Sequence, residues 1–68
     1  MSTSAKKLAV NIKRIRIEKN MTQGDLCRAT DLDRAYISNI ESAKKNPTLT
    51  TIEKIAKALG VSVDELMK

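Results

Sequence analysis

Apolar residues recur at helical spacing along almost the whole chain, and this pattern predicts an all-α protein. The first helix is expected to run from Ser4 or Ala5 to Lys19, where Asn20 tolerates the left-handed conformation that ends many helices. Its buried stripe would consist of Leu8, Ile12 and Ile15. Two further apolar residues fall on the opposite side and are expected to be exposed: Val10 and Ile17.

Two short helices are predicted next, each opened by a capping residue. Thr22 is the expected N-cap of the second helix, and Asp25 three residues later completes the pattern of a capping box. This helix should end near Thr30. Asp33 is the expected N-cap of a third helix over residues 34–42.

The last third of the chain predicts two more helices. The sequence Asn46-Pro47-Thr48 indicates a loop and then a cap, because proline pushes the residue before it into extended geometry. Gly60 should end the fourth helix, and Ser62 with Glu65 forms a second capping-box pattern that opens a short fifth helix. The buried face expected for the fourth helix consists of Leu49, Ile52, Ile55, Ala56 and Leu59.

Residues 23–42 match a helix-turn-helix motif inside a single domain over residues 1–68. Leu26 supplies the inward apolar residue and Cys27 the small residue that lets the second helix of the motif approach closely. Asp31 tolerates a positive φ in the turn, and Leu32 then packs inward. The second helix of the motif has apolar residues three apart, at Ile37 and Ile40. The expected fold is therefore a compact five-helix bundle with a helix-turn-helix.

Composition adds an expected partner. Lysine and arginine total 13 against 8 aspartate and glutamate residues, a formal net charge of +5. On a small domain this favours nucleic acid as a partner, a merely solvated basic surface being the alternative. Tyr36 is the only aromatic residue, which argues against platforms that stack the bases of single strands or RNA loops. Double-stranded DNA is the expected ligand.

The residue inventory argues against an enzyme. Histidine is absent and Cys27 is the only cysteine, which excludes Cys/His zinc sites and histidine-based catalysis. No nucleophile–base pair, metal set or phosphate loop stands out, so we expect no cofactor, no metal and no small-molecule substrate. A single thiol fits a reducing compartment, and no apolar run suits a signal peptide or a membrane span. A cytoplasmic protein without membrane contact is expected.

The chain resembles the Cro and phage-repressor-like helix-turn-helix family of XRE type, from about Leu8 to Leu66. The matching pieces are Ile12, Ile15, Arg16, Met21-Thr22-Gln23, Leu26, the run from Leu32 to Glu41, Asn46-Pro47-Thr48 and the run from Ala56 to Val61. The resemblance implies a lambda-repressor-like DNA-binding domain and a structural ion pair between Arg16 and Glu41. The run Asp33 to Glu41 looks closest to controller proteins of restriction–modification systems, although phage repressors and antitoxins use similar helices.

A helical wheel of the third helix places polar side chains opposite the two isoleucines, where they would face the DNA major groove. The expected base contacts are Arg34, Ala35, Ser38 and Asn39. The expected contacts to the DNA backbone are Gln23, Tyr36, Ser42, Lys44, Lys45 and Asn46. For Tyr36 the alternative is packing at the core edge, and for the lysines it is a solubilising charge run.

The last predicted helix carries more apolar surface than so short an element can bury. We expect Leu66 in the core and a homodimer interface formed by Val61, Val63 and Met67. Two recognition helices would then lie about 34 Å apart on a pseudo-palindromic operator, near a promoter where RNA polymerase is a further possible partner. The competing hypothesis is an antitoxin-type interaction module that binds a partner protein.

Overall fold

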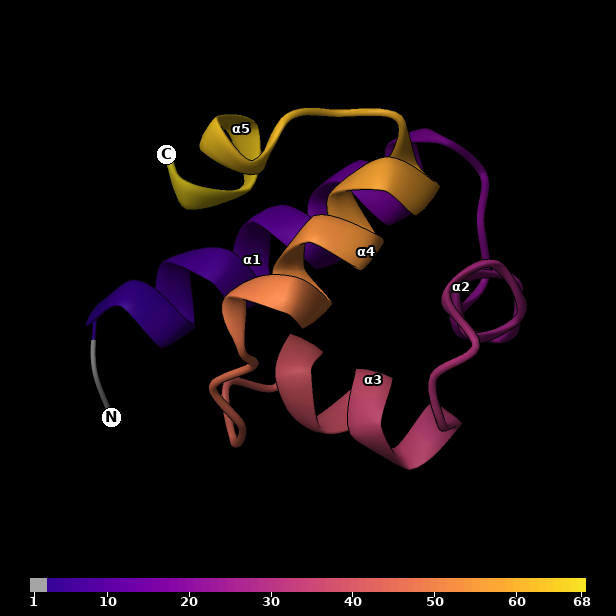
Figure 1. Ribbon diagram of the computed structural model, residues 1–68, viewed down its shortest axis with the longest axis horizontal. Coiled ribbons are helices and arrows are strands. Elements are labelled where there is room, and N and C mark those ends of the chain that lie inside the picture. The colour runs from indigo at the N-terminus through magenta and orange to yellow at the C-terminus, as the bar shows by residue number, and fades with distance from the viewer. Residues whose placement is uncertain (1–2) are drawn as a thin grey trace.

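The computed structural model describes residues 3–68, with side chains from Ala5 onward. Its elements are five helices: α1 Thr3–Glu18, α2 Gln23–Thr30, α3 Arg34–Glu41, α4 Leu49–Leu59 and α5 Val63–Met67 (Figure 1). No strand occurs in residues 3–68, and the expected all-α fold of five helices is confirmed. None of these helices combines the length and the apolar character that a membrane crossing requires.

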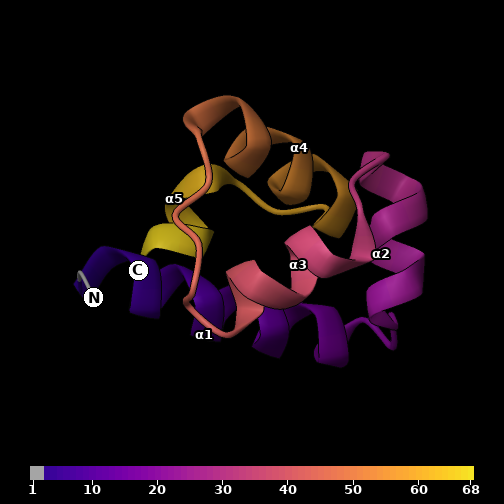
Figure 2. The ribbon, with the colours of Figure 1, turned by 90° about the horizontal axis from the view of Figure 1, so that it is seen from below.

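All five helices contribute to one core. α1 packs against α3 and α5, α2 packs against α3 and α4, and α4 contacts α5 and α1. Figure 1 places α2 at the opposite end of the molecule from α5, and Figure 2 shows α1 along one edge with α3 beside it. The buried cluster consists of Leu8, Ile12, Ile15, Leu26, Ile37, Ile40, Ile52, Ile55, Ala56, Leu59 and Leu66.

Each connection between helices contains a residue with left-handed backbone geometry. These residues are Asn20 (φ 58°), Asp31 (φ 59°), Ala43 (φ 62°) and Gly60 (φ 72°). The conformation bends the chain sharply at a helix end, and it disfavours residues that carry a Cβ. Only the last of the four is glycine, so three turns retain backbone strain. The expected stops at Asn20 and Gly60 and the positive φ at Asp31 are confirmed.

The capping predictions differ in outcome. Thr22 and Asp25 form the complete capping box at the start of α2. Ser62 accepts a hydrogen bond from the Glu65 backbone at the start of α5, but within the described residues the reciprocal bond from the Glu65 carboxylate is absent. Asp33 is confirmed as the N-cap residue of α3, although its side chain forms no cap hydrogen bond.

Leu49 corrects the predicted face of α4. The other four residues of that face are buried, but Leu49 is 64% exposed. Helical spacing places Leu49 on the same side as Ile52, one turn later. As the first residue of α4, however, it lies in a turn that extends beyond the packed core. Its large apolar side chain is therefore available on the surface.

Asn11 is a buried polar residue that the sequence pattern did not reveal. It lies among the buried residues of α1 at 9% exposure, and its Nδ2 donates to the Leu66 carbonyl oxygen at 2.8 Å. Leu66 is in the last turn of α5, where backbone carbonyls have no partner inside the helix. The bond therefore fixes the short α5 on α1. The sequence signal that could have revealed this contact is the position of a polar residue, Asn11, within the apolar stripe of α1.

Candidate nucleic-acid interface

The outer surface of α3 carries the residues predicted to contact DNA bases. Ile37 and Ile40 are each 1% exposed and anchor α3 on the core. Opposite them, Arg34, Ala35 and Ser38 are exposed and Asn39 is half-buried. The helical wheel thus places this surface correctly.

The polar side chains on this surface have no partners of their own. Among residues 5–68, the side chains of Arg34, Ser38 and Asn39 form no hydrogen bond or ion pair, and α3 has no acidic residue in its first turn. Arg34 therefore presents five N–H donors, and Asn39 presents an amide that can donate and accept at once. These are the groups that pair with guanine and adenine edges in the major groove.

The end of α3 holds the following loop through its backbone. The Asn39 carbonyl oxygen accepts the backbone N–H groups of Lys44 at 2.9 Å and Lys45 at 3.2 Å. It also accepts the Ser42 hydroxyl at 3.3 Å. Lys44, Lys45 and Asn46 are exposed, so this short segment presents two ammonium groups and an amide directly beside α3.

Tyr36 is shared between the core edge and this loop. Its side chain is half-buried and packs against the core, as one of the two predicted interpretations requires. The Lys45 Nζ lies 5.1 Å from the centre of the Tyr36 ring, a cation–π contact. Lys45 and α3 are therefore linked by a side-chain contact as well as by the backbone.

The start of α2 is occupied by its own capping residues. The Thr22 hydroxyl accepts the Asp25 backbone N–H at 3.0 Å, and the Asp25 carboxylate accepts the Thr22 N–H at 2.9 Å. The bond from the Thr22 N–H, the Thr22 side chain and the nearby Arg28 together hold the pKa of Asp25 below its ordinary value. Arg28 also forms an ion pair with Asp25.

Gln23 uses part of its amide inside the protein. Its Nε2 donates to Glu41 Oε1 at 3.1 Å, which joins the start of α2 to the end of α3. Sequence reasoning assigned Gln23 to a phosphate and did not foresee this internal bond. The second N–H of the amide and its oxygen are outside this bond, so a phosphate contact by Gln23 stays a prediction.

Arg16 and Glu41 form an ion pair beneath the motif. Arg16 Nε lies 2.7 Å from Glu41 Oε2, and Arg16 Nη2 donates to Glu41 Oε1 at 3.0 Å. The side chains are 10% and 3% exposed. Arg16 Nη1 also donates to the Met21 carbonyl oxygen at 2.7 Å, and the hydrogen bond to Glu41 is the main reason that the pKa of Arg16 is raised. This cluster fixes α1, the α1–α2 turn and α3 relative to one another.

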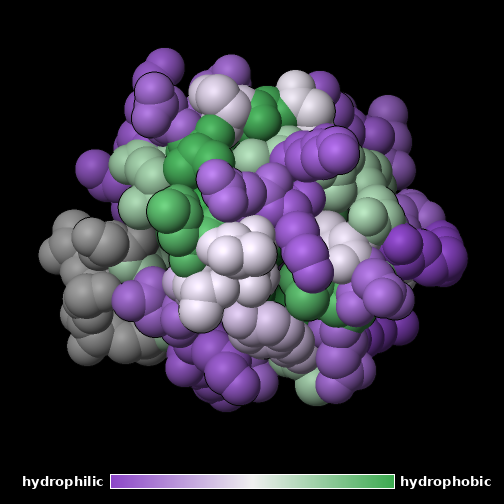
Figure 3. Space-filling model, in the orientation of Figure 1, coloured by the Kyte–Doolittle hydropathy of each residue, from purple (hydrophilic) through white to green (hydrophobic). Residues whose placement is uncertain are grey.

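The residues expected at a dimer interface belong to a second surface, formed by α5 and the residues next to it. Val61 and Val63 are half-buried against the core, and Leu66 is fully buried as predicted. Met67 is 37% exposed, and Leu49 at 64% adds apolar area that was not foreseen. In Figure 3 hydrophobic side chains gather between α5 and the start of α4.

Comparison with known proteins assigns the fold and the motif to one family. Residues 12–66 match the helix-turn-helix family. The control protein C.BamHI of Bacillus amyloliquefaciens is 47% identical over 57 residues, which cover 82% of this chain and 70% of that protein. The restriction–modification controller protein C.Esp1396I, solved as a tetramer in complex with its natural 35 base-pair operator, superimposes with a TM-score of 0.87 at 41% identity, covering 100% of both chains.

Other relatives are longer than this chain. A hypothetical transcription factor of Neisseria meningitidis is 42% identical over 60 residues, or 88% of this chain and 57% of that protein. The match to the immunity repressor protein of Bacillus phage phi105 covers 39% of the repressor. The chain thus spans only part of the length of these two proteins.

Proposed function

Because the chain belongs to the XRE-type helix-turn-helix family, we propose that it is a transcriptional regulator that binds a specific double-stranded DNA operator and catalyses no reaction. The observation that supports this proposal best is the outer surface of α3, where the side chains of Arg34, Ser38 and Asn39 present hydrogen-bonding groups that have no partner among residues 5–68. The identity to control proteins and the operator complex of one relative support restriction–modification genes as the regulated genes.

Sequence is read by α3 in the major groove. Arg34, at the start of the helix, grips the O6 and N7 atoms of a guanine with its two-pronged guanidinium. Asn39 pairs with an adenine, Ser38 offers a short donor or acceptor, and the Ala35 methyl group meets a thymine methyl. Because Ile37 and Ile40 fix α3 from beneath, these groups meet the bases as one rigid set.

Phosphate contacts position α3 and supply most of the salt-dependent affinity. The loop that contains Lys44, Lys45 and Asn46 contacts the phosphates of one DNA strand. Backbone hydrogen bonds from this loop to the Asn39 carbonyl oxygen keep it beside the outer surface of α3. Ser42 and the Tyr36 hydroxyl add donors along the same edge. At the other edge, the N-terminus of α2 and the second amide N–H of Gln23 approach a phosphate.

The active species is a homodimer on a pseudo-palindromic operator. Val61, Val63 and Met67 form the contact, and the exposed Leu49 extends it at the start of α4. A two-fold interface places two copies of α3 about 34 Å apart, one turn of DNA. Bound near a promoter in the cytoplasm, the dimer blocks or recruits RNA polymerase.

Selection of binding sites from random duplex DNA tests this function. We expect the selection to enrich a two-fold symmetric sequence. The affinity of the wild-type protein for this sequence should be higher at low salt than at high salt. Arg34→Ala should weaken operator binding by about 1–3 kcal/mol and relax the preference at one base position per half-site. Arg14→Ala, which removes an exposed arginine of α1, is the matched control and should bind as the wild type does. An unenriched pool would refute sequence-specific binding.

A further inference from the structure

The outer surface of α1 carries two large aliphatic side chains that the fold does not use. Val10 is 59% exposed and Ile17 is 56% exposed. They are seven residues apart, so they lie on the same side of the helix, about 10 Å apart along its axis at 1.5 Å per residue. Two aliphatic residues in this register form a stripe of the kind that a second helix can cover.

This stripe faces away from the protein interior. The buried residues Leu8, Ile12 and Ile15 occupy the opposite side of α1, which packs on α3 and α5. In Figure 2 α1 runs along one edge of the molecule with no other described element beyond it. The stripe is therefore separate from the outer surface of α3.

Basic side chains surround the two aliphatic residues. Lys6, Lys7, Lys13 and Arg14 are all exposed on the same side of α1. The only acidic residue of α1 is Glu18, which lies 3.2 Å from Arg14. Among residues 5–68, the three lysines form no ion pair. The surface thus combines an apolar centre with an uncompensated positive rim.

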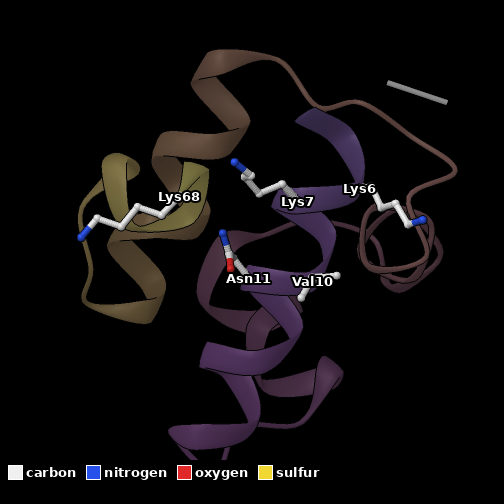
Figure 4. Close-up of a pocket in the computed structure, with 5 residues that line it drawn as sticks. All are labelled: Lys6, Lys7, Val10, Asn11 and Lys68. Carbon is white, nitrogen blue, oxygen red and sulfur yellow. The ribbon is translucent and has the colours of Figure 1, made fainter. Parts of the chain in front are cut away.

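A hollow at one end of the stripe offers room for a side chain. It has a volume of about 370 Å³ and is lined by Lys6, Lys7, Val10, Asn11 and Lys68. Figure 4 shows Lys7 and Asn11 directed toward α5, with Val10 and Lys6 on the side of α1 that is turned away from α5. The Asn11 amide donates to the Leu66 carbonyl oxygen, so α1 and the end of α5 are held together beside the hollow.

We propose that this surface, named here the α1 face (Lys6, Lys7, Val10, Lys13, Arg14 and Ile17), docks an acidic amphipathic helix of a partner protein. Aliphatic residues of that helix cover Val10 and Ile17, one of them entering the hollow, while its carboxylates meet the lysines. A phosphate backbone would use the lysines but would leave both aliphatic side chains in contact with charged groups. Val10 and Ile17 at the centre of the α1 face therefore favour a protein partner over a nucleic-acid partner.

A designed peptide provides the test, without DNA and independently of the proposed operator binding. The probe is a helical peptide of glutamate and alanine with leucines at positions i, i+3 and i+7. A scrambled peptide of the same composition and a short DNA duplex are the comparison probes. Binding is followed by the amide signals of the isotope-labelled full chain in NMR spectra. We expect the amphipathic peptide to shift signals around Val10 and Ile17, and the scrambled peptide to leave them unchanged.

Matched variants locate the site. Val10→Ser combined with Ile17→Ser should weaken peptide binding about tenfold. Because both side chains are exposed, the variant should keep its circular dichroism spectrum. Leu49→Ser removes an equally exposed aliphatic residue elsewhere, and Arg34→Ala removes the proposed base contact; both should bind the peptide normally. Equal binding of the scrambled peptide, unchanged affinity of the double variant, or shifts at the α1 face caused by duplex DNA alone would overturn the proposal.

Discussion

Helices α2 and α3 are each eight residues long, but their polar side chains are used in opposite ways. In α2 the capping residues bond to each other and Arg28 pairs with Asp25, so these side chains find their partners within the helix and its cap. In α3 the N-cap residue makes no cap hydrogen bond, and the exposed polar side chains have no partner within the described part of the chain. One helix of the motif stabilises itself, whereas the other is stabilised from beneath and leaves its outer surface open.

This difference indicates where α3 obtains its stability. Its exposed polar side chains contribute little, so its position depends on the two buried isoleucines and on its last residue, Glu41, which accepts bonds from Arg16 and Gln23. This agrees with the proposed role of the surface, because a donor or acceptor that is paired inside the protein is no longer free to bond to DNA. Changes beneath α3 should therefore affect stability, and changes on its surface should affect binding.

The largest effect is expected from breaking the support beneath α3. Glu41→Ala leaves the Arg16 guanidinium, with a side chain only 10% exposed, without its counter-charge. The free energy of unfolding should fall by about 3 kcal/mol, as for other partly buried pairs that lose one member. Urea denaturation measures this value. Glu53→Ala, at an exposed glutamate of α4, is the control and should change stability by less than about 0.5 kcal/mol. An unchanged midpoint for Glu41→Ala would show that the pair does not support the fold.

The second prediction compares the two N-caps directly. Thr22→Ala removes the hydroxyl that accepts the Asp25 N–H and should cost about 1 kcal/mol of unfolding free energy. Asp33→Ala should cost less than half of that, because only the interaction of its charge with the helix dipole is lost. Thermal unfolding of the two variants at equal ionic strength gives the comparison. Equal losses would mean that the two helix starts are stabilised alike.

The turn between the two helices offers a gain in stability. Asp31 has a φ of 59°, a conformation that glycine adopts without a Cβ clash. Asp31→Gly should raise the free energy of unfolding by up to about 1 kcal/mol, and Asp31→Ala should lower it. Asp31→Asn, which removes the charge but keeps the side-chain shape, separates electrostatics from backbone strain. A loss of stability with glycine would show that the aspartate side chain contributes more than the strain costs.

The smallest effect is a dependence on pH at the start of α2. Because the folded-state pKa of Asp25 is lowered, its ionised carboxylate stabilises the fold above its ordinary pKa of 3.8. That contribution is lost as the pH falls through the lowered value. The wild type should therefore lose more stability than Asp25→Asn between about pH 5 and about pH 2.5. Chemical denaturation at both pH values measures it, and parallel losses would contradict the sign.

Local interactions made most of the fold predictable. The helix starts at Thr22, Thr48 and Ser62 follow from residues within three positions of each other. The left-handed conformations of Asn20, Asp31 and Gly60 each follow from the residue type at that one position. The outer surface of α3 was equally predictable from the sequence, because helical periodicity alone places Arg34 and Ser38 opposite Ile37 and Ile40. These predictions need no knowledge of tertiary contacts.

Contacts between distant residues were not predictable in this way. The bond from Asn11 to the Leu66 carbonyl joins residues 55 positions apart, and that from Gln23 to Glu41 joins residues 18 apart. The Arg16–Glu41 pair was expected from family resemblance and not from spacing. Leu49 was misplaced because periodicity gives the side of a helix but not how far the packed core extends along it.

Tyr36, placed between the core edge and Lys45, has a practical consequence. The chain contains no tryptophan or phenylalanine, so its near-ultraviolet fluorescence originates from this single phenol. Emission intensity and quenching therefore report on the junction of α3 with its loop and on no other region. Titration with a candidate operator duplex can be followed optically at that junction in the unlabelled protein, with no dye to perturb the outer surface of α3.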